Sequence, residues 1–167
     1  VKAATDPTDP TDPTEPESEV FDGVRLEWTG SGEVQALPPF GGSNYLSAGT
    51  SNGTEATYAA TAGNVGVYHK ASDGTVAPAT WATRAAHTSG GGTQLVRVAD
   101  GSAEVWEDGS AVIEWTGSWS VNFYGGLAPF TISDPVLTID EDGDGQLTAE
   151  LAGCPPPPQN PNVCAPI

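Results

Sequence analysis

Positive charge is scarce in this chain of 167 residues. Five Lys and Arg residues stand against twenty-two Asp and Glu residues, which gives a formal net charge of -17 at pH 7. Nucleic acids and anionic lipids are bound through clustered Lys and Arg side chains, so the sequence predicts neither as a partner. Strong like charge also favours solubility and keeps copies apart, which is typical of proteins exposed outside the cell.

Long apolar runs and methionine are also missing. No stretch approaches the roughly 20 apolar residues that a transmembrane helix needs, so we expect no direct insertion into a membrane. The chain contains no Met, and we therefore expect Val1 to be an end produced by processing. A processed, acidic chain without a membrane segment predicts a secreted protein, at the cell surface or free outside it.

Cysteine is rare, and its placement bears on the compartment. Cys154 and Cys164 flank a Pro-rich stretch near the C-terminal end. Two thiols with no nearby His supply half of a zinc site at best, so a disulfide between them is the preferred interpretation. Disulfides form in oxidising compartments, in agreement with secretion. Asn52-Gly53-Thr54 fits a glycosylation sequon, although Asn-Gly is also a turn signal, which we favour.

Residue types that carry catalysis are few. His69 and His87 are the only histidines, and neither lies in a metal-binding or triad motif. The glycines at 90–92 lack the following Lys of a phosphate-binding loop. The acidic residues could supply paired carboxylates for glycoside hydrolysis, but most fall on expected turns and exposed strand faces. The sequence therefore predicts a protein without enzymatic activity.

The N-terminal segment, residues 1–19, has a repeat of its own. Pro7, Pro10, Pro13 and Pro16 recur every three residues, which is the period of a polyproline II helix. Each Pro fixes its own φ and keeps the residue before it out of the α region, so the segment should be extended. It is either a solvated linker or a strap that docks on a neighbouring copy of the domain and so builds an oligomer or filament.

Residues 20–152 have the pattern of a β domain. Residues 113–123 alternate apolar and polar side chains with a period of two, as do residues 24–28 and 147–151. Further short strands are expected at 55–60, 65–70, 93–98 and 103–107, with a short helix near 78–86. Short strands, Gly-rich turns and no long helical periodicity predict an all-β fold, an antiparallel sandwich or barrel-like single domain. Residues 153–167 form a Pro-rich tail closed by the expected disulfide.

The turn before the last expected strand has some features of a calcium loop. Asp140, Asp142 and Asp144 occupy positions 1, 3 and 5 of such a loop. The acid expected at position 12 is replaced by Leu151, with Glu150 one position early. The flanking residues alternate as strands rather than helices, so an acidic hairpin turn is the preferred interpretation. A calcium site formed by Asp140, Asp142, Asp144 and Glu150 is the alternative.

Several short motifs in the C-terminal half resemble one known family. They are Gly109–Ala111, Trp115–Gly117, Val121–Leu127, Thr131–Pro135 and Leu147–Ala149. Together they resemble the C-terminal half of the Hta (haem-transport-associated) domain of secreted and wall-linked proteins of Gram-positive bacteria. The most specific element is Ser133-Asp134-Pro135, whereas the start of the domain matches only loosely. The resemblance implies a β domain on the outside of a cell.

The resemblance also implies haem. In that family haem is bound by a Tyr near the domain start, assisted by a His in a Gly-His-x-Gly segment. Tyr45 is the nearest match to the Tyr, whereas the His is replaced by the shortened segment Tyr124–Leu127. A phenolate ligates ferric iron, so the candidate ligands are Tyr45, then Tyr124, with His69 and His87 behind them. Two functions are therefore expected: a structural or assembly module outside the cell, or a haem-binding domain of a surface uptake system.

Overall fold

The fold is built almost entirely from β-strands, as the sequence predicts. A computed structural model describes residues 17–153 and 165–166. In this part of the chain the elements are β1 (Ser18–Trp28), α1 (Gly32–Gln35), β2 (Tyr45–Ala48), the 3₁₀ helix η1 (Glu55–Thr57), β3 (Thr61–Ala62), β4 (Val65–Lys70), β5 (Val76–Pro78), α2 (His87–Gly90), β6 (Thr93–Trp106), β7 (Ala111–Glu114), β8 (Ser118–Phe123), β9 (Ala128–Ile139), β10 (Gly145–Gly153) and β11 (Ala165–Pro166). Among the described residues, no helix is long and apolar enough to cross a membrane.

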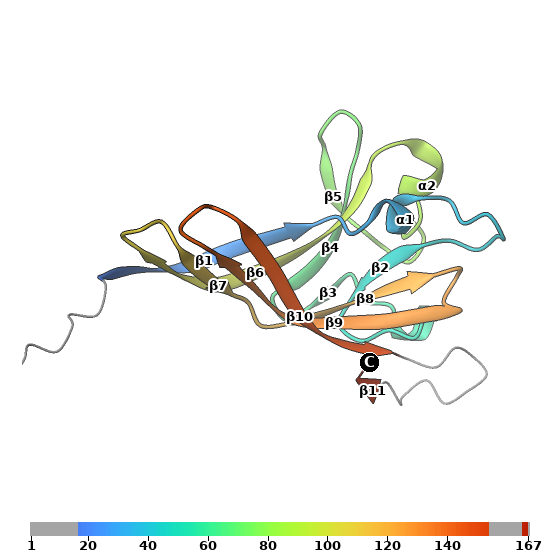
Figure 1. Cartoon of the computed structure of the whole chain (residues 1–167). Coiled ribbons are helices and arrows are strands. Elements are labelled where there is room, and N and C mark those ends of the chain that lie inside the picture. Colours follow the sequence, from blue (N-terminus) through green and yellow to red (C-terminus); the bar gives the residue numbers. More distant parts are fainter. Residues whose placement is uncertain (1–16, 154–164, 167) are drawn as a thin grey trace, which may run out of the picture.

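All eleven strands belong to one antiparallel sheet that curves into a barrel-like body (Figure 1). The long strand β6 organises it. On one edge β6 pairs with β4 through residues 93–98 and with β7 through residues 102–105. On its other edge it pairs with β1 along most of its length. Strand β9 is used in the same way, with β7 and β8 on one edge and β10 on the other.

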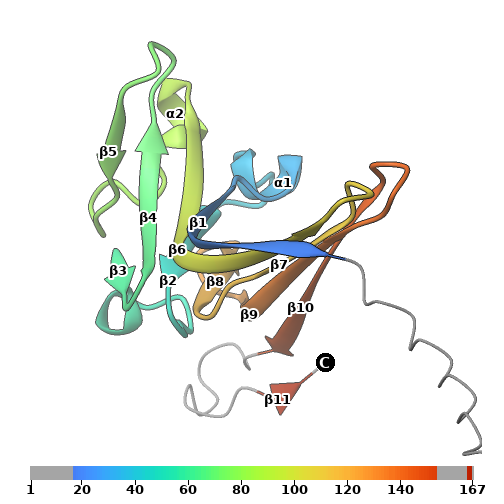
Figure 2. The ribbon, with the colours of Figure 1, turned by 90° about the vertical axis from the view of Figure 1, so that its left-hand side faces the viewer.

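One end of the sheet extends from the body as an arm, which points to the left in Figure 1. We define the arm as residues 18–24, 101–106, 111–114, 136–139 and 145–148. Its strands lie in the order β1, β6, β7, β9 and β10, so β1 and β10 form its two edges. The two edge strands lie at opposite sides of the arm in Figure 2.

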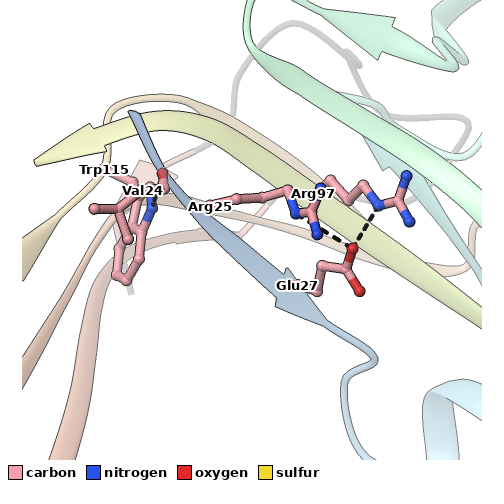
Figure 3. Close-up of polar contacts among 5 residues, drawn as sticks. All are labelled: Val24, Arg25, Glu27, Arg97 and Trp115. Carbon is pink, nitrogen blue, oxygen red and sulfur yellow. Dashed lines mark hydrogen bonds and ion pairs between the residues drawn. The ribbon is translucent and has the colours of Figure 1, made fainter. Parts of the chain in front are cut away.

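The core lies inside the body. Its largest side chain is Trp119, which is 2% exposed and has its ring centroid 5.6 Å from that of Trp28. Around it pack aliphatic side chains of the barrel strands, among them Leu46, Val96 and Val98. At the junction with the arm, Trp115 is also buried, and its indole Nε1 donates to the carbonyl oxygen of Val24 at 3.0 Å (Figure 3). The core therefore reaches to the base of the arm.

The prediction of one continuous strand over residues 113–123 is wrong. It is divided into β7 and β8, with residues 115–117 between them. Gly117 has φ +130°, and its N–H donates to Asp134 Oδ1 at 2.8 Å, while the Asp134 N–H donates to the Gly117 oxygen at 2.9 Å. On β9, two residues (134 and 135) lie between the positions that pair with β7 and β8. On the other side, three residues (115–117) lie between β7 and β8, and this extra residue makes a bulge. This irregularity turns the chain from the arm into the body.

The prediction that the polar face of this segment is exposed to solvent is also wrong at two positions. Ser120 and Asn122 are fully buried. The reason is the loop at 49–57, which packs over this face of β8: Ser120 Oγ donates to the Gly49 oxygen and accepts from the Ser51 N–H, both at 2.8 Å. Asn52 is buried in the same loop, where its Oδ1 accepts from the hydroxyl groups of Thr54 and Thr57. Asn52 Oδ1 also accepts from the Thr54 N–H at 3.3 Å, a local bond that agrees with the turn interpretation of Asn52-Gly53.

Other boundaries differ from the predictions. Residues 65–70 form the expected strand, but 55–60 contains η1 instead of a strand, and the helix expected near 78–86 lies at 87–90. The strands expected at 93–98 and 103–107 are both part of β6. The alternation at 147–151 predicts a strand correctly but a buried face wrongly, since all of these residues are exposed along β10. Both expected tails contribute strand residues, Ser18 to β1 and Ala165 to β11.

Candidate functional site

Among the described residues, the outer edge of β1 has no pairing partner. Within the described part of the chain, β1 pairs only with β6, although it is eleven residues long. It contains no Pro, and two consecutive apolar side chains near its start, Val20 and Phe21, are 67% and 48% exposed. An unpaired row of N–H and C=O groups flanked by apolar side chains is a template on which a further strand can be added.

The second half of β1 is less accessible to such pairing. Gly23 has φ +73°, and the register with β6 shifts on both sides of Val24, so the strand bulges there. Bulges twist an edge away from a regular partner. Beyond the bulge, Glu27 Oε1 contacts Arg97 Nε at 2.7 Å and Arg25 Nε at 3.4 Å, which ties this half to β6 (Figure 3). Residues 18–22 are therefore the part of the edge that is regular and can accept another strand.

The opposite edge of the arm is similar. Residues 145–151 of β10 pair with β9, and β11 covers only residues 152 and 153. Leu147 and Leu151 on this edge are 44% and 43% exposed. The register places Leu147 at the end of an apolar row that crosses the arm from edge to edge: Phe21, Ala103, Ile113, Leu137 and Leu147. Both ends of this row are exposed, whereas its middle is partly or largely buried.

Tyr45, the first candidate haem ligand, is 1% exposed. Its hydroxyl donates to the carbonyl oxygen of Gly53 at 2.6 Å. The ring packs edge-on against Trp81, with centroids 5.9 Å apart, and beneath the guanidinium of Arg84 at 5.4 Å. Burial raises the pKa of Tyr45, although the positive charge of Arg84 opposes this shift. The side chain is therefore a protonated phenol that packs in the interior and donates its hydrogen bond to Gly53.

Tyr124, the second candidate, lies in the turn after β8. Its φ is +55°, and its hydroxyl donates to Glu33 Oε1 at 2.8 Å. This hydrogen bond and the negative charge of Glu33 raise the pKa of Tyr124, because both disfavour the phenolate. Iron ligation by either tyrosine would require the hydrogen bond that its hydroxyl now donates to be broken.

The two histidines, which the sequence ranks last, are brought together. The ring centroids of His69 and His87 lie 5.8 Å apart, with the ring planes inclined by 29°, and His87 is 6% exposed. Both line a pocket of about 310 Å³ with Lys70, Thr75 and Thr93. Burial lowers the pKa of each imidazole below its ordinary value, so both are neutral at pH 7. Seventeen residues, which include strand β5, separate them along the chain, and no local motif predicts that they meet.

The candidate calcium residues do not gather. Asp140 Oδ1 accepts from the N–H groups of Asp142 and Asp144, at 3.1 and 2.8 Å, and so closes the hairpin turn. Glu150 lies on β10 opposite Ser133, beyond a register shift. Within residues 17–153 and 165–166 no three His, Cys, Asp or Glu side chains form a cluster suited to a metal ion. Cys154, Cys164 and residues 1–16 lie outside the described residues.

Sequence reasoning missed Trp81 and Arg84. Arg84 lies 3.7 Å above the Trp81 ring, and with Tyr45 and Tyr58 these side chains form an aromatic cluster beside β2. Burial raises the pKa of Tyr58 to about 12. A Trp and an Arg three residues apart in a turn do not predict an aromatic cluster, because the tyrosines that they contact come from distant segments of the chain.

Comparisons with known proteins give no relative: no protein-family model, no curated protein and no solved structure matches the chain. The functional argument therefore rests on the geometry of the molecule.

Proposed function

We propose that this chain is a non-catalytic module that works outside the cell, where it assembles with other copies of itself through the β1 edge of the arm. The observation that carries the proposal is the free edge at residues 18–22 with Val20 and Phe21 exposed beside it. Edges of this kind are normally protected by charged side chains, most often Lys, by Pro or by a covering segment. Residues 18–22 contain no Lys and no Pro, and their charged side chains are those of Glu19 and Asp22.

The receiving surface is the β10 edge of a neighbouring copy. Phe21 and Leu147 end the same apolar row, so joining these edges continues both the sheet and the row from one copy to the next. Fully burying a side chain such as Phe or Leu contributes about 1.5–3 kcal/mol, and each contact would bury part of two of them. Because the two edges are different surfaces, the contact is heterologous and produces an open filament unless the rotation closes it.

The segment before β1 assists as a strap. In the sequence it directly precedes β1, which begins at Ser18. Its Pro spacing pre-extends the chain, which lowers the entropy lost when it docks along a neighbour. Pro at every third position cannot supply ladder hydrogen bonds, so the strap lies in a groove while residues 18–22 make the strand contact.

The test compares Phe21→Lys with Phe40→Lys, measured by light scattering after size separation. Both add one positive charge at an exposed Phe, but Phe40 is 92% exposed in a loop outside the arm. We expect Phe21→Lys to reduce the assembled fraction at least about tenfold, and Phe40→Lys to leave it unchanged. Equal assembly of Phe21→Lys and the parent would reject the edge contact. Deleting residues 1–16 measures the strap separately, with a weaker loss expected.

Haem binding at a surface uptake system is the second proposal, and it rests on the family resemblance alone. It requires Tyr45 to leave the Gly53 carbonyl and its aromatic neighbours before it can meet iron. A hemin titration of the parent and of Tyr45→Phe decides it. A Soret band in the parent that is lost in the variant supports Tyr45 ligation, and a parent spectrum equal to free hemin rejects haem.

A further inference from the structure

The His69–His87 pair has an unusual arrangement of hydrogen bonds. His69 lies on β4, His87 begins α2, and their rings are inclined by only 29°. His87 Nε2 is 3.2 Å from the carbonyl oxygen of Val34. A carbonyl can only accept, so Nε2 carries the hydrogen and Nδ1 presents a lone pair. That Nδ1 is buried and has no partner within the part of the chain that the structure describes.

In His69 the ring nitrogen Nε2 is also buried, and it has no hydrogen-bond partner among the described residues. Leaving a polar atom buried and unsatisfied costs about 1–3 kcal/mol, and here two such atoms occur on adjoining rings. A ring nitrogen that is free while the other nitrogen is held by a backbone carbonyl is the usual state of a metal-binding His, since the second bond fixes the tautomer and the ring orientation.

We propose that His69 Nε2 and His87 Nδ1 together bind one first-row transition-metal ion, with copper preferred. Two imidazoles that share an ion through bonds of about 2.0–2.1 Å place their ring centroids at most roughly 6 Å apart, and the observed separation is 5.8 Å. Imidazole nitrogen suits copper and zinc, and copper binds such sites most strongly among the divalent ions.

The pocket completes the site. It supplies about 310 Å³ of space beside both rings, and Thr75 and Thr93 line it. In the described part of the chain no third His, Cys, Asp or Glu joins the pair, so solvent molecules take the remaining positions on the ion. Lys70 lines the same pocket, and its positive charge weakens the affinity for a cation. This site is independent of the β1 edge and does not rest on assembly.

Copper(II) titration of the metal-free protein tests the proposal, followed by calorimetry and electron paramagnetic resonance. Excess glycine and calcium suppress weak binding to the acidic surface. We expect one ion per chain with coupling to imidazole nitrogen in the parent. His69→Gln and His87→Gln should each weaken binding at least about tenfold, the scale of lost support for a metal ligand. The control Asp140→Asn/Asp144→Asn, which removes acidic side chains elsewhere, should bind like the parent.

Unchanged copper affinity in both His variants, or a parent spectrum without imidazole nitrogen, would overturn the proposal. His87→Gln removes a buried side chain and can impair folding, so the thermal midpoint of each metal-free variant is measured first. His69 is more exposed, and its variant decides the matter if His87→Gln unfolds. Zinc titration of the parent, followed by ring ¹⁵N resonances, adds a readout that needs no variant. Resonances of both rings should shift together, and unshifted rings would contradict the site.

Discussion

At the scale of single residues, Trp119 is the side chain on which the core depends most. It is 2% exposed and contacts Trp28 within the central cluster. Trp119→Ala should lower the free energy of unfolding by roughly 3–5 kcal/mol, because the cavity cannot be refilled by its neighbours. Urea denaturation measures the loss, and Phe40→Ala, at an exposed site, should stay within about 0.5 kcal/mol of the parent. A loss below about 1 kcal/mol at Trp119 would contradict the placement of this ring in the core.

The histidine pair predicts a dependence of stability on pH. Burial lowers the pKa of His69 and His87 below their ordinary 6.5, so the unfolded chain binds more protons than the folded one as the pH falls. The stability that they contribute is present above pH 6.5 and is lost as the pH falls through their lowered values. The pKa of Asp73 and Asp108 lies below 3.8 and leaves this window untouched.

The measurement is the free energy of unfolding of metal-free protein between pH 7.5 and 5. We expect a decrease with falling pH in the parent and a flatter profile in His69→Gln. Parallel profiles of the two proteins would show that His69 is not the titrating group.

Residue types alone do not predict which polar side chains are buried. Ser120 and Asn122 have the period of a wet strand face, and only the loop at 49–57 makes that face internal. Tyr45 is a suitable haem ligand by residue type, yet its hydroxyl is taken by the Gly53 carbonyl from the same loop. Contacts made by a returning loop depend on tertiary structure, which a local pattern does not contain.

At the scale of elements, the irregularity between β7 and β8 depends on Gly117. Its φ of +130° is reserved for Gly, and an added Cβ would lie 2.7 Å from Val65 Cγ2 and 2.9 Å from Asn64 Oδ1. Asn64 cannot move freely, because its Nδ2 donates to the oxygens of Ala99 and Thr116. Gly117→Ala should therefore cost roughly 2–4 kcal/mol through strain and crowding together.

The matched control is Gly74→Ala in the β4–β5 turn. Gly74 also has positive φ, +87°, but nothing lies within 4 Å of an added Cβ. It should lose only about 1–2 kcal/mol, the cost of the backbone conformation alone. Equal losses at the two glycines, measured by urea denaturation, would show that the contacts of Gly117 with the body do not matter.

The division of residues 113–123 into two strands explains why strand structure can be predicted here while the strand boundaries cannot. The bulge leaves Trp115 and Trp119 on buried sides, so the apolar pattern continues through it. The signal for the break is the pairing of Gly117 with Asp134, which lies on another strand. Likewise, alternation at 147–151 predicts β10 correctly, but a buried face also requires a covering layer, and the edge of the arm has none among the described residues.

At the scale of the whole molecule, fold class was predictable and architecture was not. Frequent Gly turns and short alternating segments are enough to predict an antiparallel all-β domain. The arm arises because β6 continues for fourteen residues and pairs with β1, and the paired residues, from Trp28 with Val96 to Ser18 with Trp106, lie 68 to 88 positions apart in sequence. Neither long-range pairing nor the meeting of His69 with His87 follows from local periodicity, whereas the acidic hairpin turn does, since Asp140 closes it with its own neighbours.

Net charge should oppose the proposed assembly. Copies that carry a formal charge of -17 repel one another, while the proposed contact is held by strand pairing and apolar side chains. Added salt shortens the screening length from about 30 Å at 0.01 M to about 10 Å at 0.1 M, so it removes repulsion and leaves the attraction. The weight-average mass of the parent, measured by light scattering, should therefore rise severalfold between 0.01 and 0.5 M NaCl.

The variant Phe21→Lys distinguishes the effect of salt on charge repulsion from the effect of the β1 edge contact. It should remain at the mass of the single chain across the whole salt range, because its Lys disrupts the edge at every ionic strength. Phe40→Lys carries the same added charge away from the arm and should follow the parent. A parent whose mass falls as salt is added would show that ion pairs hold the copies together. In that case the exposed carboxylates and Arg25 of β1, rather than Val20 and Phe21, would be the side chains that make the contact.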